Sequence, residues 1–232
     1  MEKPWLDARS EYVARMFGAI AEHYDLMNRV MTLGQDQRWR RQAVDISTIA
    51  PGDTALDVAT GTGDLAFELA HRVQPGGHVL GLDFAEPMLD IARKKARRKG
   101  LSVSFESGDA LSLPYGDASF QAITCGFGLR NMDDRARALA EMARVARPGG
   151  RVVILELTPP RNALARAYMD EVIPKLGQLL AHAREAYTYL PESVKDFPDA
   201  WTLGRMMQQA GLRSVTFRLL NFGTIALHWG TR

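Results

Sequence analysis

The chain has 232 residues, of which 46% are hydrophobic and 24% are charged, a composition typical of one large globular domain with a full core. Its 29 lysines and arginines against 27 aspartates and glutamates leave a formal net charge of +2, too small to indicate nucleic acid as the main partner. A single cysteine, Cys125, excludes an internal disulfide and a multi-thiolate metal site.

No stretch reaches the roughly 20 apolar residues that cross a bilayer, and the charged start Met1-Glu2-Lys3 is unlike a secretory signal. The five histidines show no metal-ligand spacing. We therefore expect a soluble, cytoplasmic protein that binds no metal and forms a single domain over residues 1–232.

Residues 10–42 precede the first expected strand and carry apolar side chains at helical spacing. Such a helix either covers an edge of the sheet or caps an active site, and the periodicity does not decide between the two. In the predicted domain organisation this segment is the N-terminal helical cap. Its apolar positions are Val13, Met16, Phe17, Ile20, Tyr24, Met27 and Met31.

Residues 54–157 alternate short apolar runs with longer amphipathic segments. The runs predict strands over 54–59, 78–82, 102–106, 120–125 and 151–157, and the segments between them predict helices near 64–73, 86–99 and 133–146. The last helix is expected to stop at Pro148-Gly149-Gly150, a break that reverses the chain. This alternation is typical of a mainly parallel sheet wrapped by helices.

The alternation lapses after the fifth strand. Residues 158–200 form a long connection with a helical stretch at about 162–183, which we expect to be an inserted helical segment that forms the substrate pocket. A further helix is predicted at 199–210. The last two strands, at 213–219 and 223–229, are too close for a crossover helix, so they must pair antiparallel.

The strongest local signal is an apolar strand that runs through Asp57 into Gly61-Thr62-Gly63 and directly into a helix. The glycines let the backbone turn sharply and let a ligand approach closely. Asp83 ends the next strand about 20 positions later, where an acidic residue can hold two ribose hydroxyls. Proteins that bind NAD and proteins that bind S-adenosylmethionine share these features.

Three features favour S-adenosylmethionine. Asp57 lies in the strand just before the loop, where a carboxylate suits a cationic amino-acid group better than a pyrophosphate. Asp109 follows the third strand, where it can accept a hydrogen bond from an adenine amino group. The break at 148–150 and the terminal antiparallel pair differ from the strand plan of a typical dinucleotide dehydrogenase. An NAD-dependent oxidoreductase stays the alternative.

Longer strings carry a more specific signal. They lie at 17–28 (FGAIAEHYDLMN), 39–40 (WR), 57–64 (DVATGTGD), 127–131 (FGLRN), 141–150, 187–193 and 226–228 (ALH). On these strings the sequence resembles the ubiquinone/menaquinone-biosynthesis C-methyltransferase family over essentially its whole length. The resemblance implies an α/β, Rossmann-like class I S-adenosylmethionine methyltransferase fold, with a mainly parallel seven-stranded sheet and an antiparallel terminal strand. It also implies S-adenosyl-L-methionine as the cofactor and a prenylated quinol as the substrate.

The same resemblance implies roles for individual residues around the cofactor. Thr62 lines the methionine end, Asp83 contacts the ribose, and Asp109 and Ala110 border the adenine. The family often has serine where this chain has Gly126, so a hydroxyl contact is lost or replaced there. The predicted cofactor-binding residues are Asp57, Gly61, Thr62, Gly63, Asp83, Asp109, Ala110 and Gly126.

The implied reaction transfers a methyl group from a sulfonium to a ring carbon, which an adjacent hydroxyl makes nucleophilic. The ring must then lose a proton, which invites a general base. The predicted catalytic residues are Arg130, Asn131 and Tyr24. Arg130 would stabilise a phenolate or position a water that Asn131 orients, and Tyr24, with His23 and Asp25, would close over the ring. The alternative for Arg130 is a salt bridge with a nearby carboxylate.

A prenyl tail keeps the substrate in the bilayer, so transient contact with the membrane surface is expected, with the tail received by residues 158–200. Basic residues cluster at 93–99, and such clusters attract anionic lipid. We favour a simply solvated helix face, because Met88, Ile91 and Ala92 point inward on the same helix.

Several alternatives stay open. The preferred acceptor is demethylmenaquinol in menaquinone biosynthesis, and the equivalent benzoquinol of ubiquinone biosynthesis or another small aromatic acceptor are alternatives. A non-catalytic scaffold that binds the cofactor without turnover is a further one. Cys125 is not expected to act as a nucleophile, because direct transfer needs no enzyme adduct. The oligomeric state is open, a homodimer included.

Overall fold

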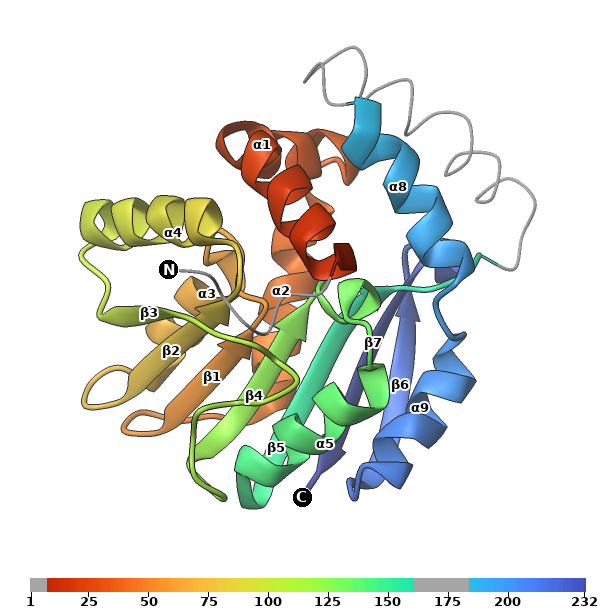
Figure 1. Ribbon diagram of the computed structural model, residues 1–232. Coiled ribbons are helices and arrows are strands. Elements are labelled where there is room, and N and C mark those ends of the chain that lie inside the picture. Colours follow the sequence, from red (N-terminus) through yellow and green to blue (C-terminus); the bar gives the residue numbers. More distant parts are fainter. Residues whose placement is uncertain (1–7, 161–183) are drawn as a thin grey trace.

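A seven-stranded sheet runs through the centre of the computed structural model, which describes residues 8–160 and 184–232 (Figure 1). The strands are β1 Thr54–Val58, β2 His78–Asp83, β3 Val103–Ser107, β4 Phe120–Gly126, β5 Ala146–Leu157, β6 Arg213–Leu220 and β7 Ile225–Thr231. Their order in the sheet is β3-β2-β1-β4-β5-β7-β6. Strands β1 to β5 pair in parallel, whereas β7 is antiparallel to β5 and β6. The predicted sheet is confirmed.

Helices cover both faces of this sheet. They are α1 Ala8–Met31, α2 Gln35–Ser47, α3 Asp64–Val73, α4 Glu86–Lys99, α5 Arg135–Val145, α8 Arg184–Lys195 and α9 Ala200–Gln209, with the 3-10 turns η1 Leu129–Asn131 and η3 Asn221–Gly223. Successive strand residues point to opposite faces. In β1, Ala55 packs with the core under α2, α3 and α4, whereas Leu56 and Val58 pack with the core under α5 and α9.

The N-terminal segment forms two helices instead of one continuous cap. The chain breaks between them, where Leu33 and Gly34 have left-handed backbone angles (φ 52° and 73°). Helix α2 buries Trp39, Ala43 and Val44 in the core on one face of the sheet. Helix α1 crosses above the carboxyl ends of the strands, beside α4 and α8 (Figure 1). Of the two roles predicted for this segment, α2 covers the sheet and α1 lies over the ends of the strands.

The predicted helix stop at residues 148–150 is wrong, because α5 ends at Val145 and β5 already begins at Ala146. The pairing of β4 with β5 shifts register between Phe120 and Ala122, so the extra residues of β5 form an irregularity in the ladder. A Cβ on the glycine at 150 would lie 2.7 Å from a backbone oxygen of β4. Gly150 therefore permits the close approach of two strands.

The remaining predicted elements fall into two groups. The helix predicted at 199–210 and the antiparallel strands predicted at 213–219 and 223–229 are confirmed as α9, β6 and β7. The helix predicted at about 162–183 lies outside the described residues. No helix within the described residues is long and apolar enough to cross a bilayer.

Candidate active site

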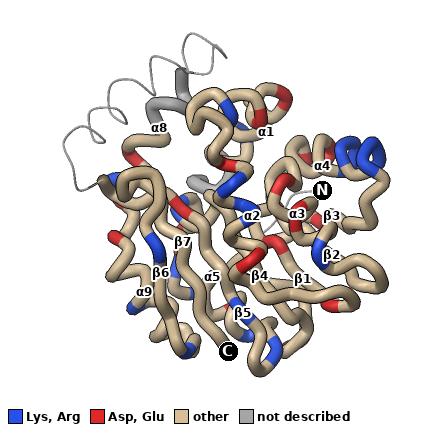
Figure 2. Tube along the Cα trace, turned by 180° about the vertical axis from the view of Figure 1, so that it is seen from behind, with Lys and Arg blue, Asp and Glu red and all other residues tan. Residues whose placement is uncertain are grey.

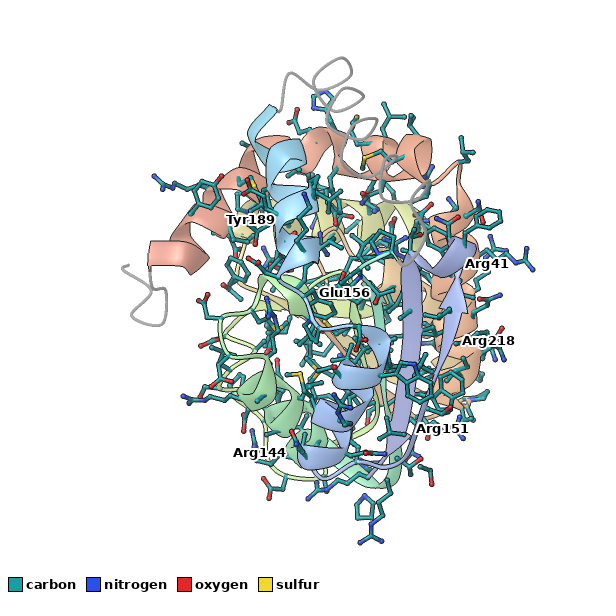
Figure 3. All side chains as sticks on the ribbon, turned by 90° about the vertical axis from the view of Figure 1, so that its right-hand side faces the viewer. Arg41, Arg144, Arg151, Glu156, Tyr189 and Arg218 are labelled. Atoms are coloured by element: carbon teal, nitrogen blue, oxygen red, sulfur yellow. The ribbon has the colours of Figure 1, made fainter. Side chains whose placement is uncertain are left out.

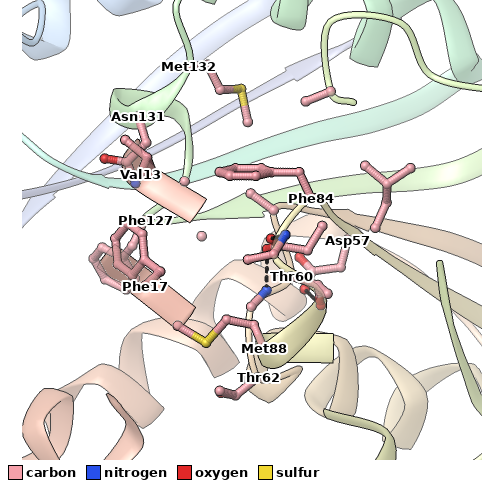
Figure 4. A pocket seen from close by; sticks show the side chains of 18 of the residues that line it. Val13, Phe17, Asp57, Thr60, Thr62, Phe84, Met88, Phe127, Asn131 and Met132 are labelled. Carbon is pink, nitrogen blue, oxygen red and sulfur yellow. Dashed lines mark hydrogen bonds between the residues drawn. The ribbon is translucent and has the colours of Figure 1, made fainter. Parts of the chain in front are cut away.

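A cavity, here called the first cavity, opens at the carboxyl ends of β1, β2 and β4 below α1 (Figure 4). The strand order reverses between β1 and β4, which is where open α/β sheets bind ligands. Its empty volume of about 1050 Å³ is sufficient for a nucleoside-sized ligand. Its wall includes parts of the loops at 57–65, 82–85, 108–111, 126–128 and 131–133, and Val13, Phe17, Tyr24, Arg40 and Met88 from three helices.

The glycine loop between β1 and α3 forms one side of the first cavity. Gly61 and Gly63 have positive φ angles of 56° and 86°, which glycine adopts without strain. A Cβ on Gly63 would lie 2.9 Å from the Phe67 ring. The amides of Gly61 and Ala85 donate to the two oxygens of Asp83 at 2.8 and 2.9 Å. These bonds hold the Asp83 carboxylate beside the cavity, at the position that the sequence assigns to the ribose.

Asp57 is a buried carboxylate at the base of the first cavity. Its two oxygens accept hydrogen bonds from the hydroxyls of Thr60 and Thr124, each at 2.6 Å. Burial raises the pKa of Asp57 to about 6, although the two hydroxyls and the nearby charge of Arg40 act in the opposite direction. A cation bound in the cavity would favour the ionised carboxylate. Asp57 is therefore suited to a positively charged ligand.

Asp109, Ala110 and Gly126 also line the first cavity. Asp109 Oδ1 accepts from the Leu111 amide at 2.8 Å, which fixes the turn after β3. A Cβ on Gly126 would lie 3.1 Å from the side chain of Leu65, so a larger residue there requires Leu65 to shift. All the predicted cofactor residues except the glycine at 63 line this one cavity, and that glycine shapes the loop behind it.

An ion-pair cluster ties α1 to the glycine loop and to α4. Lys95 of α4 donates to Asp25 Oδ2 at 2.6 Å and to the carboxylate of Asp64. The Thr62 hydroxyl donates to the other oxygen of Asp25 at 2.6 Å. Since Thr62 and Asp64 line the first cavity, this cluster links the position of α1 directly to the wall of that cavity. Lys95 is therefore a site residue that the sequence pattern did not predict.

Lys and Arg gather on α4 (Figure 2). The basic residues at 93–99 separate into two groups by their exposure and pairing. Those at 94 and 97–99 are exposed along α4, as predicted for a solvated face. Arg93 pairs with Glu86 at 2.6 Å, and the Lys95 side chain is only 19% exposed. For Lys95 the solvated interpretation is wrong, because its ammonium group lies between two carboxylates.

A second cavity adjoins the first on the side of α1, α2 and α8, with an empty volume of about 960 Å³. Its wall is mostly apolar and includes Ile20, Met31, Trp39, Leu157, Leu190 and Ile225. Four residues line both cavities, namely Phe17, Tyr24, Arg40 and Phe127. Phe127 has a φ angle of 60°, uncommon for a residue with a side chain. The two cavities therefore meet at these four side chains.

Arg130 lines the second cavity, but its charge is already paired. Its Nη1 donates to Glu156 Oε1 at 2.9 Å and to the Phe127 carbonyl, and its backbone amide donates to Glu156 Oε2 at 3.2 Å. The Arg130 and Glu156 side chains are 5% and 1% exposed. Arg130 therefore forms a salt bridge with a nearby carboxylate, which was the alternative to its predicted catalytic role. Glu156 (Figure 3) is a partner that the sequence analysis missed.

Asn131 and Tyr24 both line the first cavity, and Tyr24 also lines the second. Asn131 Oδ1 accepts from the hydroxyl of Tyr189 on α8 (labelled in Figure 3) at 3.2 Å, which links η1 to α8. His23 is exposed, and Asp25 is held in the ion-pair cluster. Of the three neighbours at 23–25, only Tyr24 lines the cavities.

Arg40 is the site residue that sequence reasoning missed most clearly. It is 7% exposed, and its Nη1 donates to Asp36 Oδ2 at 2.5 Å. Its guanidinium lies 5.4 Å from the centroid of the Phe127 ring, within the range of a cation–π contact. Arg40 could have been found only through the pair Trp39-Arg40, one of the short stretches that resemble the family. Helical periodicity could not say what would face this side chain.

Two further expectations concern Cys125 and metals. Burial raises the pKa of the Cys125 thiol well above its usual range, and a buried thiol of this kind is unreactive. Over residues 8–160 and 184–232, no group of three or more His, Cys, Asp and Glu side chains is placed to hold a metal ion.

Known proteins resemble this chain over most of its length. A sequence model of the ubiE/COQ5 methyltransferase family matches residues 6–232. A Thermus thermophilus protein named demethylmenaquinone methyltransferase is 49% identical over 221 residues, which cover 94% of this chain and all of that protein (100%). A Deinococcus radiodurans protein of the same name is 48% identical over 228 residues, which cover 97% of this chain and 94% of that protein. A Desulfotalea psychrophila protein named ubiquinone/menaquinone biosynthesis C-methyltransferase UbiE is 43% identical over 224 residues. These cover 95% of this chain and 90% of that protein.

Solved structures share the fold at much lower identity. A putative S-adenosylmethionine-dependent methyltransferase from Methanococcus maripaludis has a TM-score of 0.68 at 16% identity and covers 100% of this chain and 97% of its own. A SAM-dependent methyltransferase from Aquifex aeolicus has a TM-score of 0.61 at 21% identity and covers 83% of this chain and 88% of its own. These likenesses concern the fold alone.

Proposed function

The chain belongs to the ubiE/COQ5 methyltransferase family, and from that premise we propose that it methylates a ring carbon of demethylmenaquinol. It is an S-adenosylmethionine-dependent methyltransferase, so the NAD-dependent oxidoreductase and the non-catalytic scaffold are wrong. The relatives at 48% and 49% identity are named for demethylmenaquinone alone. This favours a naphthoquinol over a benzoquinol acceptor.

The junction of two cavities of different polarity supports this proposal most directly. The first cavity is lined by Asp57, Asp83 and Asp109 and fits a charged nucleoside cofactor. The second cavity is mostly apolar and fits an aromatic ring with the start of a prenyl tail. Because the two cavities share one boundary, a methyl group at the end of the cofactor would face the ring across it.

Within the first cavity, the roles of individual residues follow from their positions. We assign the methionine end of the cofactor to Asp57 and Thr62, because the buried Asp57 carboxylate favours a cationic neighbour. We assign the ribose hydroxyls to Asp83, and the adenine to Asp109 and Ala110, which all line the cavity.

The chemical step needs little from the protein beyond alignment. A sulfonium methyl is already activated, so the enzyme contributes by positioning the ring and excluding water. In this proposal Tyr24 and Asn131 border the transferred methyl group. Arg130 is a positioning residue, because its salt bridge to Glu156 holds η1 and thereby orients Asn131.

The test is a labelling experiment with two acceptors. The protein is incubated with methyl-labelled S-adenosylmethionine and either demethylmenaquinol or the corresponding demethylated benzoquinol with the same tail. We expect label in the naphthoquinol product and about tenfold less in the benzoquinol. Label in the benzoquinol alone would overturn the naphthoquinol assignment. Label in neither, with S-adenosylhomocysteine still bound in calorimetry, would overturn the quinol substrate.

We also propose transient contact between a bilayer and one rim of the second cavity. Leu33 and Phe222 are 85% and 90% exposed. They neighbour Thr32 and Asn221, which line that cavity. Exposed apolar side chains beside an apolar cavity mark an interaction site, and a prenyl tail that leaves the cavity here would enter lipid.

Vesicle flotation separates this rim from the basic face of α4. With vesicles of zwitterionic and anionic phospholipid, we expect Leu33→Ser/Phe222→Ser to lower the floated fraction. Arg97→Glu/Arg98→Glu, which reverses two exposed charges on α4, is expected to leave it unchanged. The reverse pattern would assign membrane contact to α4 and not to the rim.

A further inference from the structure

Two arginines border the cavities, and each pairs through Nη1 with one buried carboxylate. They differ in where they lie. Among the described residues that line either cavity, Arg40 and Arg130 are the only cations. Arg130 Nη1 is taken up by Glu156 and by a backbone carbonyl, and Arg130 lines the second cavity only. Arg40 lines both cavities. Only Arg40 therefore lies at the boundary across which a methyl group would pass.

The guanidinium of Arg40 is fixed and still has donors to offer. Its Nη1 is held by Asp36, whose other oxygen accepts from the Thr32 hydroxyl at 3.1 Å. The face of the guanidinium lies near the Phe127 ring, 5.4 Å from its centroid. With the described residues, Nε and Nη2 of Arg40 form no hydrogen bond, so they are available to a ligand in the cavities. An arginine held on one side by a carboxylate is well suited to bind an anion on the other.

We infer that Arg40, and not Arg130, stabilises the phenolate oxygen of the acceptor ring during methyl transfer. The inference rests on the proposed function, since it requires a quinol in the second cavity. A phenol has a pKa near 10, so only about one molecule in a thousand is ionised at pH 7. A cation beside the oxygen lowers that pKa by roughly one to three units. Arg40 thereby raises the population of the nucleophilic form.

The step balances without a further reactant. The acceptor hydroxyl loses its proton to water, and the phenolate charge is delocalised onto the ring carbon. That carbon forms a bond to the methyl carbon as the carbon–sulfur bond breaks, and the electron pair stays on sulfur as a neutral thioether. The methylated carbon then loses its proton to water, which restores the aromatic ring and the phenolate. Arg40 stays protonated throughout.

The alternative role for Arg40 is structural, as half of a buried ion pair that holds the start of α2. The two roles predict different pH profiles. Loss of a structural pair lowers the amount of folded enzyme at every pH. Loss of phenolate stabilisation shifts the rising limb of kcat/KM to higher pH and is partly repaired as the acceptor ionises by itself.

The experiment compares Arg40→Gln with Arg41→Gln, a neighbour whose side chain is 62% exposed. We expect kcat/KM for the quinol at pH 7 to fall about 100-fold in Arg40→Gln, with the rising limb displaced by roughly one to three pH units. Arg40→Lys should recover part of the rate, and Arg41→Gln should match the wild type. The dissociation constant for S-adenosylhomocysteine, measured by calorimetry, should change much less than kcat/KM, because Asp57, Asp83 and Asp109 stay in place in the first cavity.

A double variant guards against misfolding. Asp36→Asn/Arg40→Gln removes both charges, so no carboxylate is left unpaired in the interior, and it should show the same displaced limb as Arg40→Gln. If the limb stays at the wild-type pH in both variants, Arg40 does not stabilise the phenolate. If the wild-type enzyme fails to methylate the quinol at all, the proposed function fails first, and the two failures are thereby distinguished.

Discussion

The two cavities differ in how they are built. The first is lined mainly by residues from one stretch of chain, 57–133, where β1, β2, β3 and β4 end. The second takes its lining from segments far apart in sequence, at 17–40, 127–130, 157, 189–190 and 221–225. A cavity on the ends of paired strands is held by the sheet ladder, whereas one between helices depends on how those helices dock. Chemistry common to the fold therefore lies on the sheet, and acceptor selection lies on the helices added around it.

The largest effect should come from the buried salt bridge between Arg130, which lines the second cavity, and Glu156. Arg130→Met leaves Glu156 buried without its partner, so we expect the free energy of unfolding to fall by about 3–5 kcal/mol, measured by urea denaturation. Arg130→Met/Glu156→Leu should recover most of the loss. Arg93→Met, which breaks an exposed pair with Glu86, should cost at most about 1 kcal/mol. A similar loss in both single variants would contradict the structural role of the buried pair.

A second prediction concerns the polar base of the first cavity. The pKa of Asp57 is raised to about 6, and a cationic ligand favours its ionised form. Affinity for S-adenosylhomocysteine, whose ammonium group is positive, should therefore fall about tenfold as the pH drops from 7 to 5. Calorimetry across this range measures the effect. Asp57→Asn should bind more weakly and without this pH dependence, and a flat profile in the wild type would contradict the role.

The same group makes an opposite prediction for the stability of the free protein. Because the folded-state pKa of Asp57 lies above the value of 3.8 expected when it is exposed, the folded state holds its proton more tightly. The contribution of Asp57 to stability is fully present below about pH 4 and is lost as the pH rises through about 6. The Asp57→Asn variant should lack this decline in a pH series of thermal unfolding.

The smallest expected effect concerns the contact of α1 with the first cavity. Lys95→Met removes the ammonium that joins Asp25 to Asp64. Since the pairs are partly exposed, we expect the KM for S-adenosylmethionine to rise about threefold. Lys94→Met, on the exposed side of α4, is the matched control and should behave as the wild type. An equal change in both variants would mean that general charge, and not the link to α1, is responsible.

The strand pattern, the glycine loop and the acidic residues after β1, β2 and β3 were predictable from sequence. Their positions depend on local rules, such as the two-residue period of a strand and the positive φ angles of Gly61 and Gly63. Residues such as Asp83 could be placed because parallel strands bring their carboxyl ends to one edge. The error at residues 148–150 arose because glycines in a strand irregularity resemble a helix stop.

The chain by itself thus determined the sheet, the first cavity and the kind of cofactor it holds, because short-range signals and sheet geometry are enough for those. Only the tertiary structure decided which carboxylate pairs with each arginine and which arginine lines both cavities. Arg130 and Arg40 look alike in sequence, and each is paired with a carboxylate. The partner of Arg130 comes from a strand 26 positions away, and only Arg40 lines both cavities. Ion pairing between distant segments follows from packing, and no local pattern records it.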